Sequence, residues 1–400
     1  MKKYILNAVV VGPDELLPEH AVVIRDDRIV AVAPMNAADG FDADGEEAMY
    51  FNAHGGYVLP GFIDIHSDYI EGVIQPRPTS LMDLELGLRE AEKHLLCHGV
   101  TTIYHSLSLV EAPGLRGDKT FRTPESWERL VRLIRGFHEG SHLIRHRVHA
   151  RYEISNLNIY ERLGDMLRLG LIHELSFMDH TPGQGQYRDL ELYSKAIDAW
   201  AREAADMSAE EIVKERQSRP VATRDMLAGL SELARERGVP LASHDDDTEE
   251  KAELMRREYG AVISEFPVEL GVAKRARELG MLVVVGAPNV VMGGSHSGNL
   301  SAVEAIKNGC ADILCSDYYP PSLLHAAFRM ESEGLTTLPQ AVKMLTLNPA
   351  RAVGLDGDFG SVEAGKKADL LVVRKIQGRP TVCECFIDGR AAVSFGYRIG

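Results

Sequence analysis

The residues best suited to chemistry stand at the ends of short apolar segments. His66 and Asp68 follow the segment YVLPGFIDI, and two residues apart in an extended strand their side chains point to the same side. Further imidazole and carboxylate groups end other apolar segments, namely Glu153, His180, His244 and Asp317. The pattern predicts that all six side chains are ligands of a divalent metal ion.

This ligand set also indicates the metal and its use. Imidazoles and carboxylates without thiolates suit Zn²⁺ first, with Mn²⁺ or Fe²⁺ as alternatives. One or two ions are expected, because a carboxylate such as Glu153 can bridge a pair. A metal ion lowers the pKa of bound water from about 15.7 toward about 7. The site therefore predicts a hydrolase, with Asp317 as the general base that takes the proton of the water.

Other titratable side chains carry a weaker signal. His105 and Glu265 also follow apolar segments, and each suits an outer partner of a ligand as well as a ligand. The histidines of helical or charged segments, or away from strand ends, are interpreted as surface or packing residues. They are His54, His94, His98, His138, His142, His146, His149, His173 and His325.

Eight apolar segments must bring the candidate ligands together. They cover residues 58–65, 101–104, 148–152, 172–178, 240–242, 261–263, 282–285 and 313–315. Amphipathic helices alternate with them, the first expected over 79–98 with Thr79 or Ser80 as its cap. This alternation predicts an α/β protein with a (β/α)₈ barrel, whose parallel strands all end at one mouth.

The two ends of the chain have a different pattern. Residues 1–56 alternate apolar and polar side chains, with two strands expected around an Asp26–Asp27 turn, and residues 369–396, within the C-terminal segment 356–400, repeat that pattern. We predict a small β-sandwich domain built from both termini, beside a barrel of residues 57–355. The segment Gln186–Arg237 is longer than a strand-to-helix connection requires, and a lid over the mouth and a subunit contact both stay open.

Composition limits the partners. A formal charge of −15 over 400 residues repels polyanions, which argues against nucleic acid and anionic membranes but leaves a small anionic substrate possible. No segment is apolar over the thickness of a bilayer. Five cysteines without the spacing of a disulfide framework or a four-cysteine zinc site indicate a reducing compartment. We expect a cytoplasmic homo-oligomer that acts on a small molecule.

A glycine-rich segment follows the seventh strand. GAPNVVMGGSHSGN, residues 286–299, is expected to be a loop whose backbone N–H groups approach an anion closely. Arg77, in the first loop, is a cation that can reach a polyanionic substrate. The predicted substrate-binding residues are Arg77, Asn289, Gly293, Gly294, Ser295, His296 and Asn299.

Several longer motifs resemble a known family. LPGFIDIHSD, FMDHTPGQ, SHDDDT, ISEFP and SDYYPPSLLHAAF, with the tail NPARAVGL and GKKADLLVV, are similar to the phosphonate-metabolism diphosphatases of the carbon-phosphorus lyase pathway, within the amidohydrolase superfamily. The resemblance implies an amidohydrolase-type metal-dependent barrel. It also implies hydrolysis of α-D-ribose 1-methylphosphonate 5-triphosphate to the 5-phosphate and pyrophosphate.

The chain departs from this family at the substrate side. Gly72, Val73 and Met292 stand where the family carries polar or cationic residues. Two alternatives therefore stay open. One is an amidohydrolase that cleaves a C–N bond in a cyclic amide or deaminates a heterocycle, and the other is a non-catalytic barrel subunit.

Overall fold

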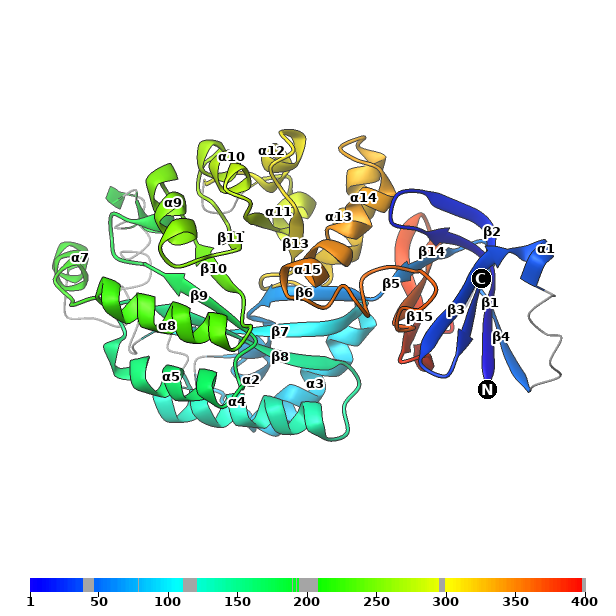
Figure 1. The fold of residues 1–400 in the computed structure, drawn as a ribbon, viewed down its shortest axis with the longest axis horizontal. Helices are drawn as coiled ribbons and strands as arrows, with labels where there is room; N and C mark the ends of the chain where they lie inside the picture. The colour runs from blue at the N-terminus through cyan, green and yellow to red at the C-terminus, as the bar shows by residue number, and fades with distance from the viewer. Residues whose placement is uncertain are drawn as a thin grey trace.

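The chain folds into a barrel beside a sheet that both termini build (Figure 1). The computed structural model describes residues 1–38, 47–77, 79–110, 121–188, 190–191, 193, 208–294 and 299–397. None of the helices within these ranges is long and apolar enough to cross a membrane.

Eight parallel strands form the barrel. They are β6 (Phe62–Ser67), β7 (Val100–Leu109), β8 (Arg145–Glu153), β9 (Glu174–Met178), β10 (Leu241–His244), β11 (Ile263–Glu265), β12 (Leu282–Gly286) and β13 (Ile313–Cys315). Neighbours in this order pair along the sheet, and a parallel bridge between Ser67 and Asp317 brings the first and last strands together. The predicted barrel is confirmed.

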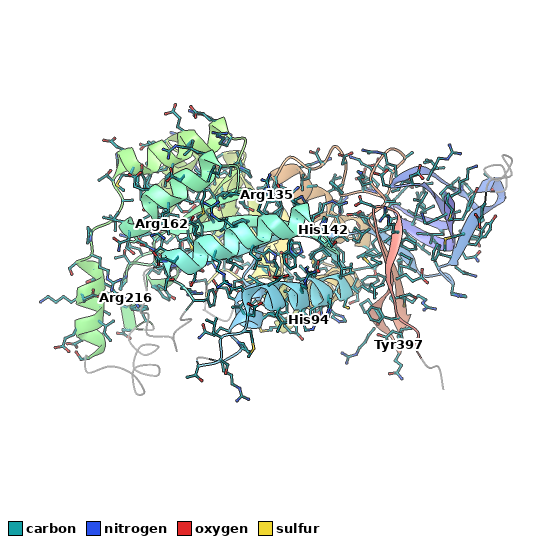
Figure 2. All side chains as sticks on the ribbon, turned by 90° about the horizontal axis from the view of Figure 1, so that it is seen from below. His94, Arg135, His142, Arg162, Arg216 and Tyr397 are labelled. Carbon is teal, nitrogen blue, oxygen red and sulfur yellow. The ribbon has the colours of Figure 1, made fainter. Side chains whose placement is uncertain are left out.

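Helices alternate with the barrel strands. They are α2 (Tyr69–Ile74), α3 (Leu84–Cys97), α4 (Pro124–Glu139), α5 (Tyr160–Arg168), α7 (Ala209–Gln217), α8 (Arg224–Glu236), α9 (Glu249–Arg257), α10 (Leu270–Glu278), α11 (Ala287–Met292), α12 (Ala302–Lys307), α13 (Ser322–Ser332), α14 (Leu338–Lys343) and α15 (Leu347–Ala352). Those such as α3, α4, α5 and α8 cover the outside of the barrel (Figure 1). Figure 2 shows α3, with His94, and α4, with Arg135, lying along the same side of the molecule. Short 3₁₀ turns cover Leu157–Ile159 and Gly185–Tyr187.

The first long helix begins later than predicted. Asp83, rather than Thr79 or Ser80, caps α3, because its carboxylate accepts a hydrogen bond from the Leu86 backbone N–H at 3.0 Å. The preceding residues pair instead with each other and with α2, through an Arg77–Ser80 bridge and a Met82 N–H bonded to the Ile74 carbonyl. The prediction of a helix over 79–98 was wrong at its start.

The terminal sheet contains β1 (Lys2–Val11), β2 (Leu16–Arg25), β3 (Arg28–Pro34), β4 (Ala48–Asn52), β5 (Tyr57–Pro60), β14 (Leu370–Ile376), β15 (Arg379–Ile387) and β16 (Arg390–Ser394). A short helix, α1 (Met35–Ala38), follows β3. The strand order is β16-β15-β14-β5-β1-β2-β3, with β4 paired to β1. Residues from the two ends of the chain, such as Ile24, Val58, Leu370 and Phe386, share one buried apolar cluster.

The apolar segment before His66 divides between the two sheets. Tyr57–Pro60 pairs with β1 and β14, and barrel pairing begins at Phe62. Gly61 makes the change of sheet, since its N–H bonds to the Asp369 carbonyl while the Phe62 N–H bonds to the Gly99 carbonyl. The single barrel strand expected over 58–65 was therefore wrong. We propose a domain division at Gly61 rather than at residue 57.

The long segment between β9 and β10 carries two helices, α7 and α8. In Figure 2, α7 with Arg216 projects away from the barrel. Residues 189, 192 and 194–207 of the expected Gln186–Arg237 insertion lie outside the described residues, and its role as a lid or a subunit contact stays a prediction.

Gly61 offers a test of the junction between the sheets. A Cβ at this position would lie 2.3 Å from the side chain of Thr101. We expect Gly61→Ala to lower the free energy of unfolding by about 1–3 kcal/mol, the usual cost of an overpacked core. Thermal and denaturant unfolding of the variant measure this change.

Gly136→Ala in α4 is the matched control. A Cβ there meets no atom within 4 Å among the described residues, and a helical alanine is favoured over glycine by about 0.5–1 kcal/mol. Equal stability of the two variants would contradict the expected steric role of Gly61.

Candidate active site

One buried carboxylate joins the two imidazoles that end β6 and β10. Glu265, the last residue of β11, accepts a hydrogen bond from His66 Nδ1 at 2.6 Å and another from His244 Nδ1 at 3.1 Å. All three side chains are buried. Because each imidazole donates its Nδ1–H to Glu265, its Nε2 atom keeps a lone pair for another partner. Glu265 therefore takes the second of the two roles that the sequence left open, an outer partner that orients His66 and His244.

The Nε2 atom of His244 meets a second group of polar side chains. His244 Nε2 lies 3.4 Å from Asp245 Oδ2, and His180 Nε2 lies 3.5 Å from the same oxygen. Ligand atoms of His180, His244 and Asp245 all lie within 4.8 Å of one another. His66, His244 and Glu265 also form such a group, but both oxygens of Glu265 already accept the imidazole N–H groups.

These residues fit a divalent metal ion. His66 Nε2 and His180 Nε2 are buried and have no hydrogen-bond partner among the described residues. An unpaired buried imidazole nitrogen is costly unless a cation or a ligand occupies the space beside it. Neutral imidazoles and carboxylates are ligands that Zn²⁺, Mn²⁺ and Fe²⁺ accept.

Glu153 is engaged with His180. Glu153 Oε2 lies 2.7 Å from His180 Nδ1, and Glu153 Oε1 accepts the His180 backbone N–H at 3.0 Å. Burial lowers the pKa of His180, but the charges of Glu153 and Asp245 outweigh it and raise the pKa to about 9, so a bound cation would displace a proton from the ring. Both oxygens of Glu153 therefore contact His180, one at the ring and one at the backbone.

Three residues at the strand ends have left-handed backbones. The φ values are 54° for Asp245, 51° for Phe266 and 55° for Asp317. Asp245 directly follows β10, Phe266 directly follows β11, and Asp317 lies two residues after the end of β13. Such φ values are costly for residues other than glycine and cluster at functional sites. Phe266 packs against the rings of His66 and His244, at centroid distances of 4.9 and 5.4 Å.

Asp68 and Asp317 lie together where the barrel closes. The Asp68 N–H bonds to the Asp317 carbonyl at 2.9 Å, and the Asp317 N–H bonds to the His66 carbonyl at 3.0 Å. Burial and the nearby charge of Asp68 raise the pKa of Asp317 to about 7. A carboxylate with a pKa near neutrality can accept and release a proton at the pH of the cell.

The guanidinium of Arg151 lies beside this acidic group. Arg151 Nη2 donates to His244 Nε2 at 3.3 Å, and Arg151 Nη1 donates to Ser108 Oγ at 3.2 Å. Burial raises the pKa of Asp245, but the contacts with His244 and His180 outweigh this effect and lower the pKa to about 2. The charge of Arg151 makes a smaller contribution in the same direction. A cation held beside candidate metal ligands is well placed for an oxyanion of a substrate.

The sequence prediction missed residues that the strands bring inward. His149 and Arg151 alternate with Glu153 along β8, and His149 Nε2 donates to or accepts from Ser176 Oγ at 2.9 Å beside the ring of His66. Glu174 is fully buried with one carboxylate oxygen 3.9 Å from His149 Nδ1, and burial raises its pKa well above the usual range. The two-residue spacing of HARYE was the available signal, because alternate strand residues face the same side.

His105 does not belong to this cluster. His105 Nε2 bonds to His146 Nδ1 at 3.0 Å, and His146 Nε2 lies 3.3 Å from Glu92 on α3. Burial lowers the pKa of His105 well below its usual range. The pair connects β7 and β8 to α3, which agrees with a packing role for His146.

The predicted anion loop is partly a helix. Residues 287–292 form α11, which ends at Gly293 with a φ of 84°, and Asn289 is half-buried within it. The expectation of a loop from 286 onward was wrong because Pro288 at the helix start and Gly293 at its end suit a short helix. Gly294 and Asn299 follow it, whereas Ser295 and His296 lie outside the described residues. Arg77 is exposed in the α2–α3 connection.

A model of the amidohydrolase family matches residues 57–392. The chain belongs to the amidohydrolase family. It is therefore a hydrolase, and amidohydrolases generally bind a divalent metal ion, in agreement with the His, Asp and Glu groups described above. The non-catalytic barrel subunit is not supported.

A comparison with curated proteins finds a relative that is similar to this amidohydrolase over most of its length. The α-D-ribose 1-methylphosphonate 5-triphosphate diphosphatase of Escherichia coli (strain K12) is 36% identical over 340 residues, which cover 82% of this chain and 85% of the relative. The resemblance to the phosphonate-pathway diphosphatases is confirmed.

Two solved structures share the amidohydrolase fold. An N-acetylglucosamine-6-phosphate deacetylase of Pasteurella multocida superposes with a TM-score of 0.63 at 12% identity, covering 98% of this chain and 99% of that chain. A β-aspartyl dipeptidase of Fervidobacterium islandicum AW-1 superposes with a TM-score of 0.64 at 14% identity, covering 100% of both chains. At these identities the likeness shows the fold alone.

The position of Glu265 generates a test. Glu265→Gln keeps the shape but removes the charge that both imidazoles face. We expect metal affinity to fall about 10–100-fold, the usual effect of losing an outer partner of metal-bound histidines. Metal content after dialysis against graded chelator measures the loss.

Glu304→Gln, on the exposed face of α12, is the control and should keep the metal content of the parent protein. A folded Glu265→Gln variant with the parent's metal affinity would show that Glu265 does not orient the ligands.

Proposed function

We propose that this amidohydrolase hydrolyses a phosphoanhydride bond and releases pyrophosphate from α-D-ribose 1-methylphosphonate 5-triphosphate. The observation that carries the proposal is Arg151, whose guanidinium donates to Ser108 Oγ and lies 3.3 Å from His244 Nε2, beside the candidate metal ligands. Guanidinium groups match the oxygens of a phosphoryl group in geometry and charge. The activity printed for the Escherichia coli relative supports the same bond.

The metal ligands are part of the proposal. His180, His244 and Asp245 would hold an ion, with His66 Nε2 unpaired within the described structure and close by. Asp68, Glu153 and Asp317 remain proposed ligands from the sequence pattern, and Zn²⁺ is the expected metal, with one or two ions bound. A bound ion would supply positive charge that polarises the phosphoryl group and makes water more acidic.

The protein residues then have distinct tasks. Asp317 accepts the proton of the attacking water, and its carboxylate is held by the backbone contacts with His66 and Asp68. Arg151 binds an oxygen of the phosphoryl group under attack. A bond forms between the water oxygen and the α-phosphorus, the bond from that phosphorus to the bridging oxygen breaks, and pyrophosphate leaves with both electrons of that bond.

The leaving pyrophosphate requires its own cations and N–H groups. We propose that Arg77, Asn289, Gly293, Gly294, Ser295, His296 and Asn299 bind it, as the sequence pattern suggested. The exposed position of Arg77 supports this role, because a side chain at the outer edge of the mouth can reach a group that points toward solvent.

A direct assay tests the activity. Purified, metal-loaded protein is incubated with the sugar triphosphate, and the products are followed by ³¹P NMR. We expect equal amounts of pyrophosphate and sugar 5-phosphate. Release of orthophosphate alone, or hydrolysis of cyclic amides without attack on the triphosphate, would overturn the proposal in favour of another amidohydrolase reaction.

Asp317→Asn tests the general base. The substitution keeps the side-chain shape and removes its basicity, so kcat should fall at least about 10²-fold. Metal content and melting temperature should remain close to those of the parent. Asp165→Asn, on the exposed face of α5, is the control. Near-normal turnover by Asp317→Asn would move the base to Asp179 or Asp245.

A further inference from the structure

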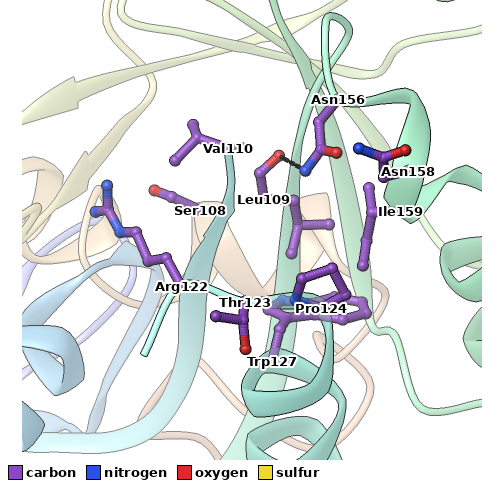
Figure 3. Close-up of a pocket in the computed structure, with 10 residues that line it drawn as sticks. All are labelled: Ser108, Leu109, Val110, Arg122, Thr123, Pro124, Trp127, Asn156, Asn158 and Ile159. Carbon is purple, nitrogen blue, oxygen red and sulfur yellow. Dashed lines mark hydrogen bonds between the residues drawn. The ribbon is translucent and has the colours of Figure 1, made fainter. Parts of the chain in front are cut away.

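A cavity of about 230 Å³ opens beside the candidate active site (Figure 3). Its wall comes from the end of β7, from the segment after β8 and from the start of α4. The lining residues are Ser108, Leu109, Val110, Arg122, Thr123, Pro124, Trp127, Asn156, Asn158 and Ile159. Figure 3 shows Arg122 and Ser108 on one side, Asn156 and Asn158 on the other, and Trp127 with Pro124 at the base.

Arg151 connects this cavity to the reacting centre. One end of its guanidinium donates to Ser108 Oγ in the cavity wall, and the other donates to His244 Nε2. A phosphoryl group bound at Arg151 would therefore lie between His244 on one side and the cavity on the other. What is attached to that phosphoryl group can enter the cavity.

The base of the cavity has an unpaired donor. Trp127 is 5% exposed, and its indole Nε1 has no hydrogen-bond partner in the described part of the chain. Leu109 and Ile159, both buried, add apolar surface beside the indole ring. A ligand that offers both an apolar ring face and an oxygen acceptor would satisfy this wall, and a sugar ring does so.

The opposite wall is suited to an anion. Arg122 Nη2 bonds to Glu71 Oε2 at 2.5 Å, and Arg122 Nε is buried without a partner among the described residues. Glu71 is itself buried and lies 3.5 Å from the Ser108 backbone N–H, so the pair holds Arg122 at the cavity. The N-terminus of the 16-residue helix α4, capped by Thr123, adds the positive end of its dipole.

We propose that this cavity binds the organic end of the substrate, a pentose that carries a small anionic group such as a phosphonate. The inference rests on the proposed function, because it assumes that the α-phosphate lies at Arg151. The cavity is smaller than the about 300–1,000 Å³ of a pocket for a drug-sized ligand, which suits a monosaccharide. Trp127 and Arg122 are then the residues that distinguish this substrate from other triphosphates.

The test compares two substrates in three variants. Trp127→Phe removes the indole N–H and keeps the ring, and Arg122→Lys keeps a charge beside the buried Glu71. Arg132→Lys is the matched control, since Arg132 lies on the exposed face of the same helix and pairs with Glu128. The substrates are the sugar phosphonate triphosphate and inorganic tripolyphosphate, which has the phosphoanhydride bonds but no sugar.

The measured quantity is the ratio of kcat/KM for the sugar substrate to that for tripolyphosphate. We expect this ratio to fall about tenfold or more in both cavity variants, as for a lost specific contact, and to stay at the parent value in Arg132→Lys. A ratio within about twofold of the parent in both cavity variants would overturn the inference while leaving the diphosphatase activity standing.

Calorimetric titration with α-D-ribose 1-phosphate separates this inference from the proposed function. If the parent hydrolyses neither substrate, the proposed function fails, but binding that weakens about tenfold in Trp127→Phe and Arg122→Lys still supports the cavity as a pentose site. No binding by the parent, or equal binding by parent and variants, would overturn the cavity assignment. Inorganic phosphate, titrated in parallel, accounts for binding that needs no sugar.

Discussion

The two hydrogen bonds that Glu265 accepts from His66 and His244 are the interaction on which the candidate active site depends. A carboxylate with no solvent exposure cannot stay charged unless donors compensate for the lost water. Burial alone would raise its pKa, yet the contacts with His66, His149 and His244 hold the pKa of Glu265 well below its usual range. The same bonds set the tautomer of both imidazoles, and so they decide which nitrogen of each ring faces the mouth.

The protonation states of the other side chains at the site depend on the same burial and on the charges around them. Burial lowers the pKa of His66 to about 4, so its ring is neutral at the pH of the cell and can act as a ligand. Asp68, Asp245 and Asp317 then place more negative charge in the mouth than Arg151 balances. Burial and this repulsion together raise the pKa of Asp317, and a divalent cation would relieve the repulsion.

Closure of the barrel and attachment of the terminal sheet hold these groups in place. Asp64 accepts the Ser316 N–H at 3.1 Å, which ties β6 to the end of β13. Arg145, the first residue of β8, bonds to Asp369 and to Asp388 of the terminal sheet and stacks on Phe359 at 4.4 Å. A largely buried ion pair with several partners resists displacement, because separating it would leave uncompensated charges. The terminal sheet thus braces the strand that carries Arg151 and Glu153.

Local sequence pattern determined the barrel, a small β domain built from both termini and the types of residue at the strand ends. Each of these follows from interactions between near neighbours, such as the alternation of apolar segments with amphipathic helices, and from the rule that parallel strands end at one mouth. The single mixed sheet of the small β domain, in place of a sandwich, appeared only in the structure. The motifs around His66, His180, His244 and Asp317 were likewise sufficient to predict the family. Local pattern was not sufficient for Gly61, where the partner strands of Tyr57–Pro60 and Phe62–Ser67 belong to different sheets.

Only the tertiary structure decided the partner of each side chain at the site. His66 and Glu265 are 199 residues apart in the sequence, and the residues adjacent to each in the chain do not indicate that the two side chains form a hydrogen bond. Glu153, expected as a bridging ligand, contacts His180 Nδ1, and Asp245, one of three adjacent aspartates, turns toward the imidazoles through a left-handed backbone. Residue types depend on the chain itself, whereas hydrogen-bond partners, tautomers and pKa values depend on the distances and burial that folding creates.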